Sequence, residues 1–201
     1  MTTLCRDDVD AFHHFLRHAD ERQIREAVAP HPGIVAEAWR CDFSVRWDSA
    51  SEKWVRKTDS DRPPDSKWVK AFRIAGYTDS GSPAQPPTQP VLLYRGAMEH
   101  TRFGMSWTPD YRAAREYAKC TGIGRPQCGN VYAHWASPHE LLARVYATGQ
   151  WSLHHAGNGV HDEYILDYRY LSGDNVQPVA VSMSNYTYMV ARYDDHDWLL
   201  L

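Results

Sequence analysis

A proline-rich segment at residues 78–90 separates two different sequence patterns in this chain of 201 residues. Before it, apolar residues recur every three or four positions, which predicts helices over residues 7–28, after Gly33, and from Asp65 to a stop at Gly76. After it come short segments rich in Val, Tyr, Trp and Ile, which predict strands. Helices followed by strands favour an α+β fold over an alternating parallel sheet.

We therefore predict a helical lobe at residues 1–89 and a β-rich core at residues 90–201. The strands expected in the core are residues 91–95, 104–108, 129–136, 163–168, 179–183 and 186–193. One helix interrupts them, with Thr108 as N-cap and Pro109 as first helical residue. Its buried stripe is expected to comprise Ala113, Ala114, Tyr117 and Ala118. Residues 44–57 alternate irregularly and fit a hairpin or a loop.

Charge and apolar content narrow the class of protein. The 22 basic and 25 acidic residues give a net charge of −3, which argues against binding nucleic acid by charge alone. No apolar run approaches the roughly 20 residues that span a bilayer, and the polar start is unlike a signal peptide. We expect a cytoplasmic protein without a membrane partner. Because the cytoplasm is reducing, free thiols are expected at the four cysteines, Cys5, Cys41, Cys120 and Cys128. A Cys120–Cys128 bridge is possible as an alternative.

Histidine spacing gives little reason to expect a metal. His14 and His18 are four positions apart, the spacing of a helical ligand pair, but no third ligand of clear spacing follows. A solvated helix face explains the pair better than a metal site does, and we expect no metal cofactor.

The segment Tyr94-Arg95-Gly96 ends an apolar strand with a guanidinium and a glycine. A guanidinium can form paired hydrogen bonds with phosphate or carboxylate, and glycine lets a ligand approach the backbone. The alternative is an Arg at a sheet edge, held in a salt bridge before a turn.

Two further segments carry polar groups on strands. Ser106 and Thr108 alternate and so share one face, while Trp107 should point the other way, into the core. His161 and Glu163 also share a side at the start of an apolar strand, where burial and neighbours can tune a carboxylate. The alternatives are a helix cap for Thr108 and a solvated turn acid for Glu163.

The order of these motifs, LYRG, then SWT with the helix TPDYRAAREYA, then HDEYIL, resembles the Arg–Ser–Glu class of ADP-ribosyltransferases. The resemblance covers residues 90–193. It implies a split, mostly antiparallel β-sandwich preceded by a helical lobe, NAD as substrate and no metal. The implied activity is mono-ADP-ribosyl transfer to a macromolecular acceptor, protein or nucleic acid. An NAD glycohydrolase, or a catalytically idle binding module on the same fold, remains an alternative.

The resemblance also implies residue roles. Glu163 would bind the ribose 2′-OH and stabilise the developing oxocarbenium, and Ser106 would support the ribose and orient Glu163. Arg95 would hold the phosphate and ribose side, and Gly96 would offer its backbone to the carboxamide. The residues that it places at the cofactor are Arg95, Gly96, Ser106, Trp107, Thr108 and Tyr117.

Three positions depart from the family pattern. Trp107 and Thr108 stand where its S-T-S strand has the central Thr and the second Ser. His161 stands where the family usually has Glu or Gln, so it is a candidate base or hydrogen-bonding group toward the acceptor. Trp151, His154 and His155, in the segment before it, are further candidates for acceptor contact. The acceptor itself and the setting, whether toxin, phage factor or housekeeping enzyme, stay open.

Overall fold

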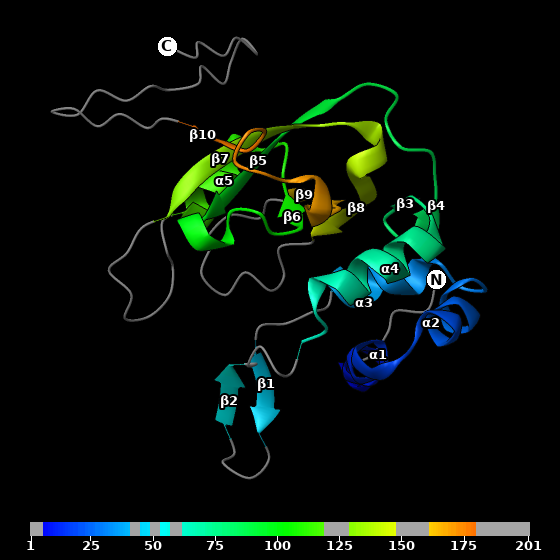
Figure 1. Ribbon diagram of the computed structural model, residues 1–201. Coiled ribbons are helices and arrows are strands. Elements are labelled where there is room, and N and C mark those ends of the chain that lie inside the picture. Colours follow the sequence, from blue (N-terminus) through cyan, green and yellow to red (C-terminus); the bar gives the residue numbers. More distant parts are fainter. Residues whose placement is uncertain are drawn as a thin grey trace, which may run out of the picture. The chain divides into compact units, whose positions relative to one another are not determined.

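The computed structural model describes six stretches of the chain (Figure 1), residues 6–40, 45–48, 53–56, 62–118, 129–147 and 161–179. It divides into two compact units. The helical unit comprises Met1–Pro86 with Leu142–Val145, and the sheet unit comprises Pro87–Leu141 with Tyr146–Leu201. Helices and strands are both well represented, which confirms the α+β class. The four cysteines and the expected strand at residues 186–193 lie outside the described residues.

The helical unit contains α1 (Arg6–His18), α2 (Glu21–Val28), α3 (Gly33–Arg40) and α4 (Asp65–Ala75). The prediction of one helix over residues 7–28 is wrong, because a capping box starts a new helix at Asp20. The Asp20 carboxylate accepts from Gln23 N, and the Gln23 side chain accepts from Asp20 N, both at 2.8 Å. Within a continuous helix these N–H groups would donate to carbonyls of the preceding turn. Side-chain acceptors replace those carbonyls here, which marks the start of a new helix.

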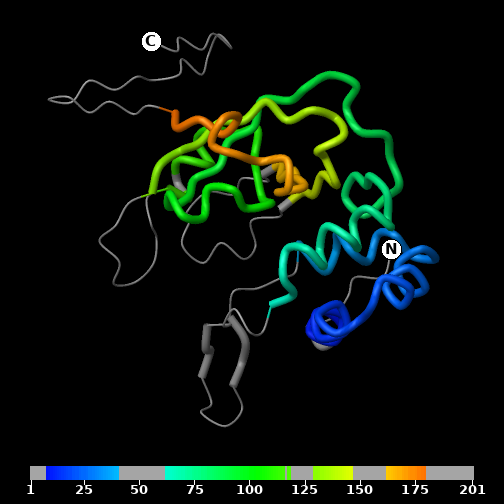
Figure 2. The backbone as a smooth tube through the Cα atoms, viewed as in Figure 1, coloured from blue at the N-terminus to red at the C-terminus, as the bar shows by residue number. Residues whose placement is uncertain are grey.

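Aromatic side chains form the core of the helical unit around α4. Trp68 and Phe72 are buried, and the Trp39 ring of α3 meets Trp68 edge-on at a centroid distance of 5.1 Å. Contacts join α4 to α1, α2 and α3, and the tube in Figure 2 shows α3 running beside it. Gly76 follows the helix at φ 75°, so the predicted stop is confirmed.

Two hairpins lie in regions for which the sequence did not predict one structure. β1 (Val45–Asp48) and β2 (Lys53–Arg56) pair antiparallel, which decides for a hairpin at residues 44–57. β3 (Thr78–Asp79) and β4 (Ser82–Pro83) form a second hairpin inside the segment expected to be a linker.

The turn of the second hairpin explains why it forms despite the prolines. Ser80 and Gly81 both have positive φ, 51° and 82°, as a two-residue type I′ turn requires. β3 also pairs in parallel with β8 (Leu141–Ala147), aligning Thr78 with Ala143. The sequence patterns did not indicate β8, and this pairing departs from a wholly antiparallel sheet.

The sheet unit holds β5 (Val91–Ala97), β7 (Asn130–Ala136) and β10 (Gln177–Pro178), antiparallel in the order β10-β7-β5. β6 (Ser106–Trp107) pairs antiparallel with β9 (His161–Leu166). The chain then makes a 3₁₀ turn at Tyr168–Tyr170, so the expected strand at residues 163–168 begins and ends two residues earlier.

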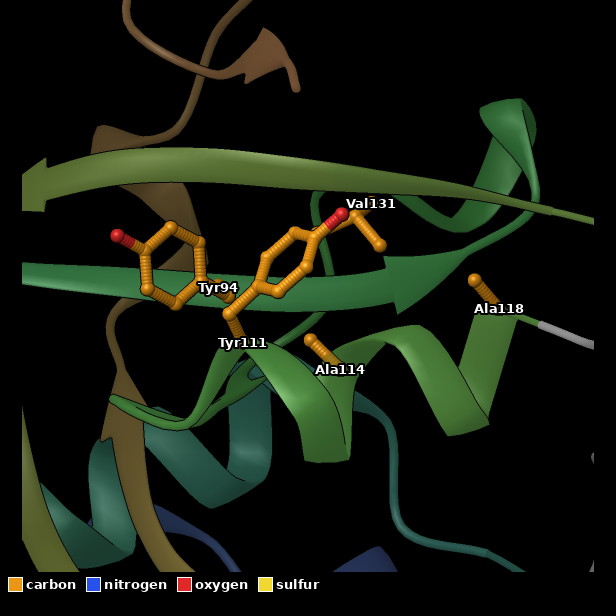
Figure 3. Packing of buried hydrophobic residues seen from close by; sticks show 5 residues of the cluster. All are labelled: Tyr94, Tyr111, Ala114, Ala118 and Val131. Atoms are coloured by element: carbon orange, nitrogen blue, oxygen red, sulfur yellow. The ribbon is translucent and has the colours of Figure 1, made fainter. Parts of the chain in front are cut away.

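Helix α5 (Tyr111–Ala118) packs on β5 and β7. Figure 3 shows Ala114 and Ala118 pointing from α5 to the sheet, and the rings of Tyr94 and Tyr111 side by side, edge to face at 5.8 Å. The Tyr117 side chain is 61% exposed, so its place in the buried stripe is wrong. At about 100° per residue it lies roughly a quarter-turn from Ala118.

In the described stretches of the chain, no helix has both the length and the apolar character needed to cross a bilayer.

Candidate functional site

The β6–β9 ladder brings the second and third sequence motifs onto one face. Ser106 pairs with Ile165, and directly opposed residues of an antiparallel pair point to the same side. Side chains two positions along a strand also share a side, so Thr108 and Glu163 belong to this face as well. Ser106 and Glu163 are both partly exposed there. A hydroxyl and a carboxylate are therefore available together on one surface.

Trp107 occupies the opposite face of β6, as its alternation predicts. It is 1% exposed, and its indole Nε1 donates to Gly104 O at 2.7 Å. A ligand at this strand would meet the Trp107 backbone and not its ring.

Thr108 joins β6 to β5 through its backbone. Tyr94 N donates to Thr108 O at 2.7 Å, and Thr108 N donates to Tyr94 O at 2.9 Å. This exchange sets the first motif, on β5, directly beside the second.

The cap of α5 is Asp110, so the prediction of Thr108 as N-cap is wrong. The Asp110 carboxylate accepts from Arg112 N at 2.7 Å and Ala113 N at 3.3 Å, which are the donors that an N-cap satisfies. Thr108 Oγ1 accepts from Asp110 N at 3.1 Å instead. The hydroxyl thus fixes the turn that leads from the site into the helix.

Arg95 reaches β6 from β5. Its Nη1 donates to Ser106 O at 2.7 Å, and its Nε donates to Thr101 O at 3.2 Å. Met105 O accepts from Leu166 N of the β9 segment, and successive carbonyls of a strand point in opposite directions. Ser106 O therefore points away from β9, so Arg95 lies beyond one edge of β6 and Glu163 beyond the other. The pairing of Tyr94 with Thr108 puts Tyr94 on the face of Ser106 and Glu163, so the Arg95 side chain leaves β5 on the opposite face and reaches β6 only through the Ser106 carbonyl.

Two glycines make room for these groups. A Cβ at Gly104 would overlap Arg95 Nη2 and lie 2.7 Å from Arg95 Cζ, so the guanidinium packs against the bare Gly104 backbone. A Cβ at Gly96 would overlap Ala114 O and lie 2.5 Å from Ala118 N. Gly96 therefore allows α5 to pack closely on β5. This packing role is separate from the contact with the nicotinamide carboxamide that the resemblance implies.

Tyr117 lies within electrostatic range of Glu163. The pKa of Tyr117 is raised from its usual value of 10, first by desolvation and second by the negative charge of Glu163. Removal of the Glu163 charge is therefore expected to lower the pKa of Tyr117.

Not every predicted site residue can be placed. His161 is the first residue of β9, and its side chain lies outside the described part, as do Trp151, His154 and His155. The motifs of Arg95, Ser106, Thr108 and Glu163 come together around β6.

The structure adds residues that sequence reasoning missed. Gly104 and the Thr101 carbonyl both contact the Arg95 guanidinium. A glycine two positions before the S-x-T segment was a usable signal for a close approach. No sequence pattern marks the carbonyl at the end of the 3₁₀ turn Glu99–Thr101, so the Thr101 contact becomes visible only in the folded structure.

Comparison with protein-family models, with curated proteins and with solved structures gives no match. The candidate site therefore stands on its own geometry and on the order of its motifs.

Proposed function

We propose that this chain is an NAD-dependent mono-ADP-ribosyltransferase, with the sheet unit as an ADP-ribosyltransferase-like core. The proposal is supported most by one observation: residues from the three separated motifs, Arg95, Ser106 and Glu163, flank or occupy the single short strand β6. Strands lie about 4.8 Å apart, so a dinucleotide that crosses the end of β6 is long enough to reach Glu163 and Ser106 on one face and the Arg95 guanidinium at the Ser106 carbonyl.

The chemistry needs a fixed negative charge at one carbon. Breaking the bond between nicotinamide and ribose leaves positive charge on the ribose C1′ while neutral nicotinamide departs. A carboxylate held beside that carbon interacts more strongly with the transition state than with the ground state, which lowers the barrier. We assign the stabilisation of this positive charge to Glu163.

The remaining groups hold and orient the substrate. Arg95 brings a permanent positive charge, held by its hydrogen bonds to Ser106 O and Thr101 O, and is assigned to the NAD phosphates. The hydroxyl of Ser106, on the face of Glu163, orients the ribose and the carboxylate. Together they fix the sugar, so that less freedom is lost on the way to the transition state.

Nicotinamide release from NAD tests the proposal directly. Wild-type protein is expected to release nicotinamide, and Glu163→Gln is expected to lower kcat by about 10²- to 10³-fold while leaving NAD affinity within a few fold. Arg95→Ala is expected to weaken NAD binding itself. A control variant, Glu26→Gln, removes an exposed carboxylate of α2 and is expected to change neither. Full activity of Glu163→Gln would refute the assignment.

A second measurement separates transfer from hydrolysis. Mass spectrometry of host macromolecules, after expression of the wild type and of Glu163→Gln, is expected to find ADP-ribose added only by the wild type. Nicotinamide release without any modified macromolecule would identify a glycohydrolase, with water as acceptor. His161→Ala is expected to reduce transfer more than hydrolysis; equal loss of both would remove His161 from the acceptor role.

A further inference from the structure

A buried polar pair adjoins the candidate site in the sheet unit. It consists of His134 on β7 and Glu140 at the end of the 3₁₀ turn η3 (Pro138–Glu140), which are 3% and 6% exposed. His134 Nε2 and Glu140 Oε2 are 2.5 Å apart. Burying ionisable groups costs free energy unless each has a close partner, so this contact is a specific feature of the fold.

The hydrogen bonds fix the orientation of the His134 ring. Nδ1 lies 2.9 Å from Asn175 O, and because a carbonyl only accepts, Nδ1 carries a hydrogen and donates it. Nε2 and Glu140 Oε2 then share one proton, and whichever atom holds it, the pair has no net charge. Both ring nitrogens are thus engaged, which holds the imidazole in one orientation.

The pair supports β6 through Trp107. The His134 and Trp107 rings lie with their centroids 5.9 Å apart, and the Trp107 indole is buried between β6 and the pair. Trp107 is paired in turn with Tyr164, the residue next to Glu163.

Glu140, the second member of the pair, supports the C-terminal end of β9. Glu140 O accepts from Asp167 N at 2.9 Å, directly after the last residue of β9. Leu166 N donates to Met105 O at 2.8 Å, so the same end of β9 is tied to the segment that precedes β6. A shift of Glu140 would therefore move the strand that carries Glu163.

We propose that His134 and Glu140 are positioning residues, which hold the β6–β9 ladder so that Glu163 meets the ribose of NAD. The inference rests on the proposed function, because it assigns the pair to the same site. Neither residue touches the reacting atoms: both act through Trp107 and through the end of β9. Misplacing a catalytic group by about 1 Å is enough to cost about 100-fold in rate.

Paired substitutions at position 140 test the proposal. Glu140→Leu removes the partner of His134, whereas Glu140→Gln keeps a side chain of equal length whose amide donates to Nε2. We expect Glu140→Leu to lower kcat by about 10- to 100-fold with the KM for NAD nearly unchanged. Glu140→Gln is expected to stay within a few fold of wild type. Glu26→Gln again serves as the control.

Titration of Tyr117 gives a readout that does not depend on activity. Its pKa is raised in part by Glu163, so displacement of β9 is expected to move it toward the value found in Glu163→Gln. We expect this shift in Glu140→Leu and not in Glu140→Gln. If the wild type does not cleave NAD, the proposed function fails, while this titration still decides whether the pair positions Glu163.

Three results would overturn the inference. The first is a wild-type kcat and Tyr117 titration in Glu140→Leu. The second is an equal loss of kcat in both variants, which would remove the distinction on which positioning depends. The third applies if Glu140→Leu does not fold: His134→Gln then replaces it, and an unchanged Tyr117 titration and kcat there would count against the pair.

Discussion

Alanine substitutions at Gly96 and Gly104 are expected to affect different properties, stability at Gly96 and NAD affinity at Gly104, although both positions lack room for a Cβ. At position 96 the new Cβ would overlap Ala114 O and lie 2.5 Å from Ala118 N. Ordinary contacts are about 3.5 Å, so α5 would have to move by more than about 1 Å. Main-chain atoms of a helix cannot rotate away, so we expect the upper end of overpacking costs, about 3 kcal/mol. For a protein of this size the Tm falls by roughly 6–12 °C.

At position 104 the obstructed atoms are the movable end of Arg95. The guanidinium can swing aside, so we expect the Tm of Gly104→Ala to stay within about 2 °C of wild type. Water can replace the hydrogen bond of 2.7 Å that the displaced group leaves at Ser106 O, because the Arg95 side chain is partly exposed. The displaced guanidinium no longer meets the NAD phosphates, and a hydrogen bond of a charged group lost to the ligand costs about 1.5–3 kcal/mol, which corresponds to NAD affinity weaker by about tenfold or more.

Thermal unfolding and calorimetric titration with NAD measure the two effects. Gly173→Ala is the matched control, because no atom lies within 4 Å of its added Cβ, and it is expected to leave both quantities unchanged. A wild-type Tm in Gly96→Ala would refute the helix-packing argument. Wild-type NAD affinity in Gly104→Ala would show that the observed Arg95 geometry does not serve binding.

Further predictions concern single polar contacts. Asp110→Ala should lower the free energy of unfolding by about 1 kcal/mol in urea, because α5 loses its N-cap. Glu163→Gln should lower the pKa of Tyr117 toward 10 in a spectrophotometric titration, because a negative charge that opposes ionisation of the phenol is gone. Asp167→Ala should cost about 2 kcal/mol, measured by urea unfolding, because the fully buried carboxylate accepts from Arg169 Nη2 at 2.6 Å and Nε at 2.8 Å. An unchanged value in any of these would contradict the corresponding contact.

The sequence predicted those elements whose signals are local. Helix α4 runs from Asp65 to Ala75 with Gly76 behind it, because apolar periodicity and a glycine stop depend only on neighbouring residues. The break at Asp20 was local too, but periodicity through both helices concealed the capping box. Strand β8 was missed because its parallel partner β3 lies over 60 positions earlier, and no local pattern encodes such a pairing.

For the candidate site, the faces on which strand residues lie could be predicted from the alternation along the sequence, whereas the contacts between side chains could not. The shared face of Ser106 and Thr108, and the burial of Trp107, follow from a period of two residues. The Arg95 contact with Gly104, and the pairing of His134 with Glu140, depend on how loops and strands return in space. Such contacts leave no period in the sequence.

The parallel pairing of β3 with β8 has a consequence for synthesis of the chain. Residues Leu142–Val145 complete the N-terminal unit, and Ser80 N donates to Arg144 O at 2.8 Å. As the polypeptide leaves the ribosome, its first eighty-odd residues therefore emerge well before the strand that finishes their fold. A fragment that ends just after the proline-rich segment would keep β3 without its partner β8, and this open strand edge would be exposed to pairing with other chains.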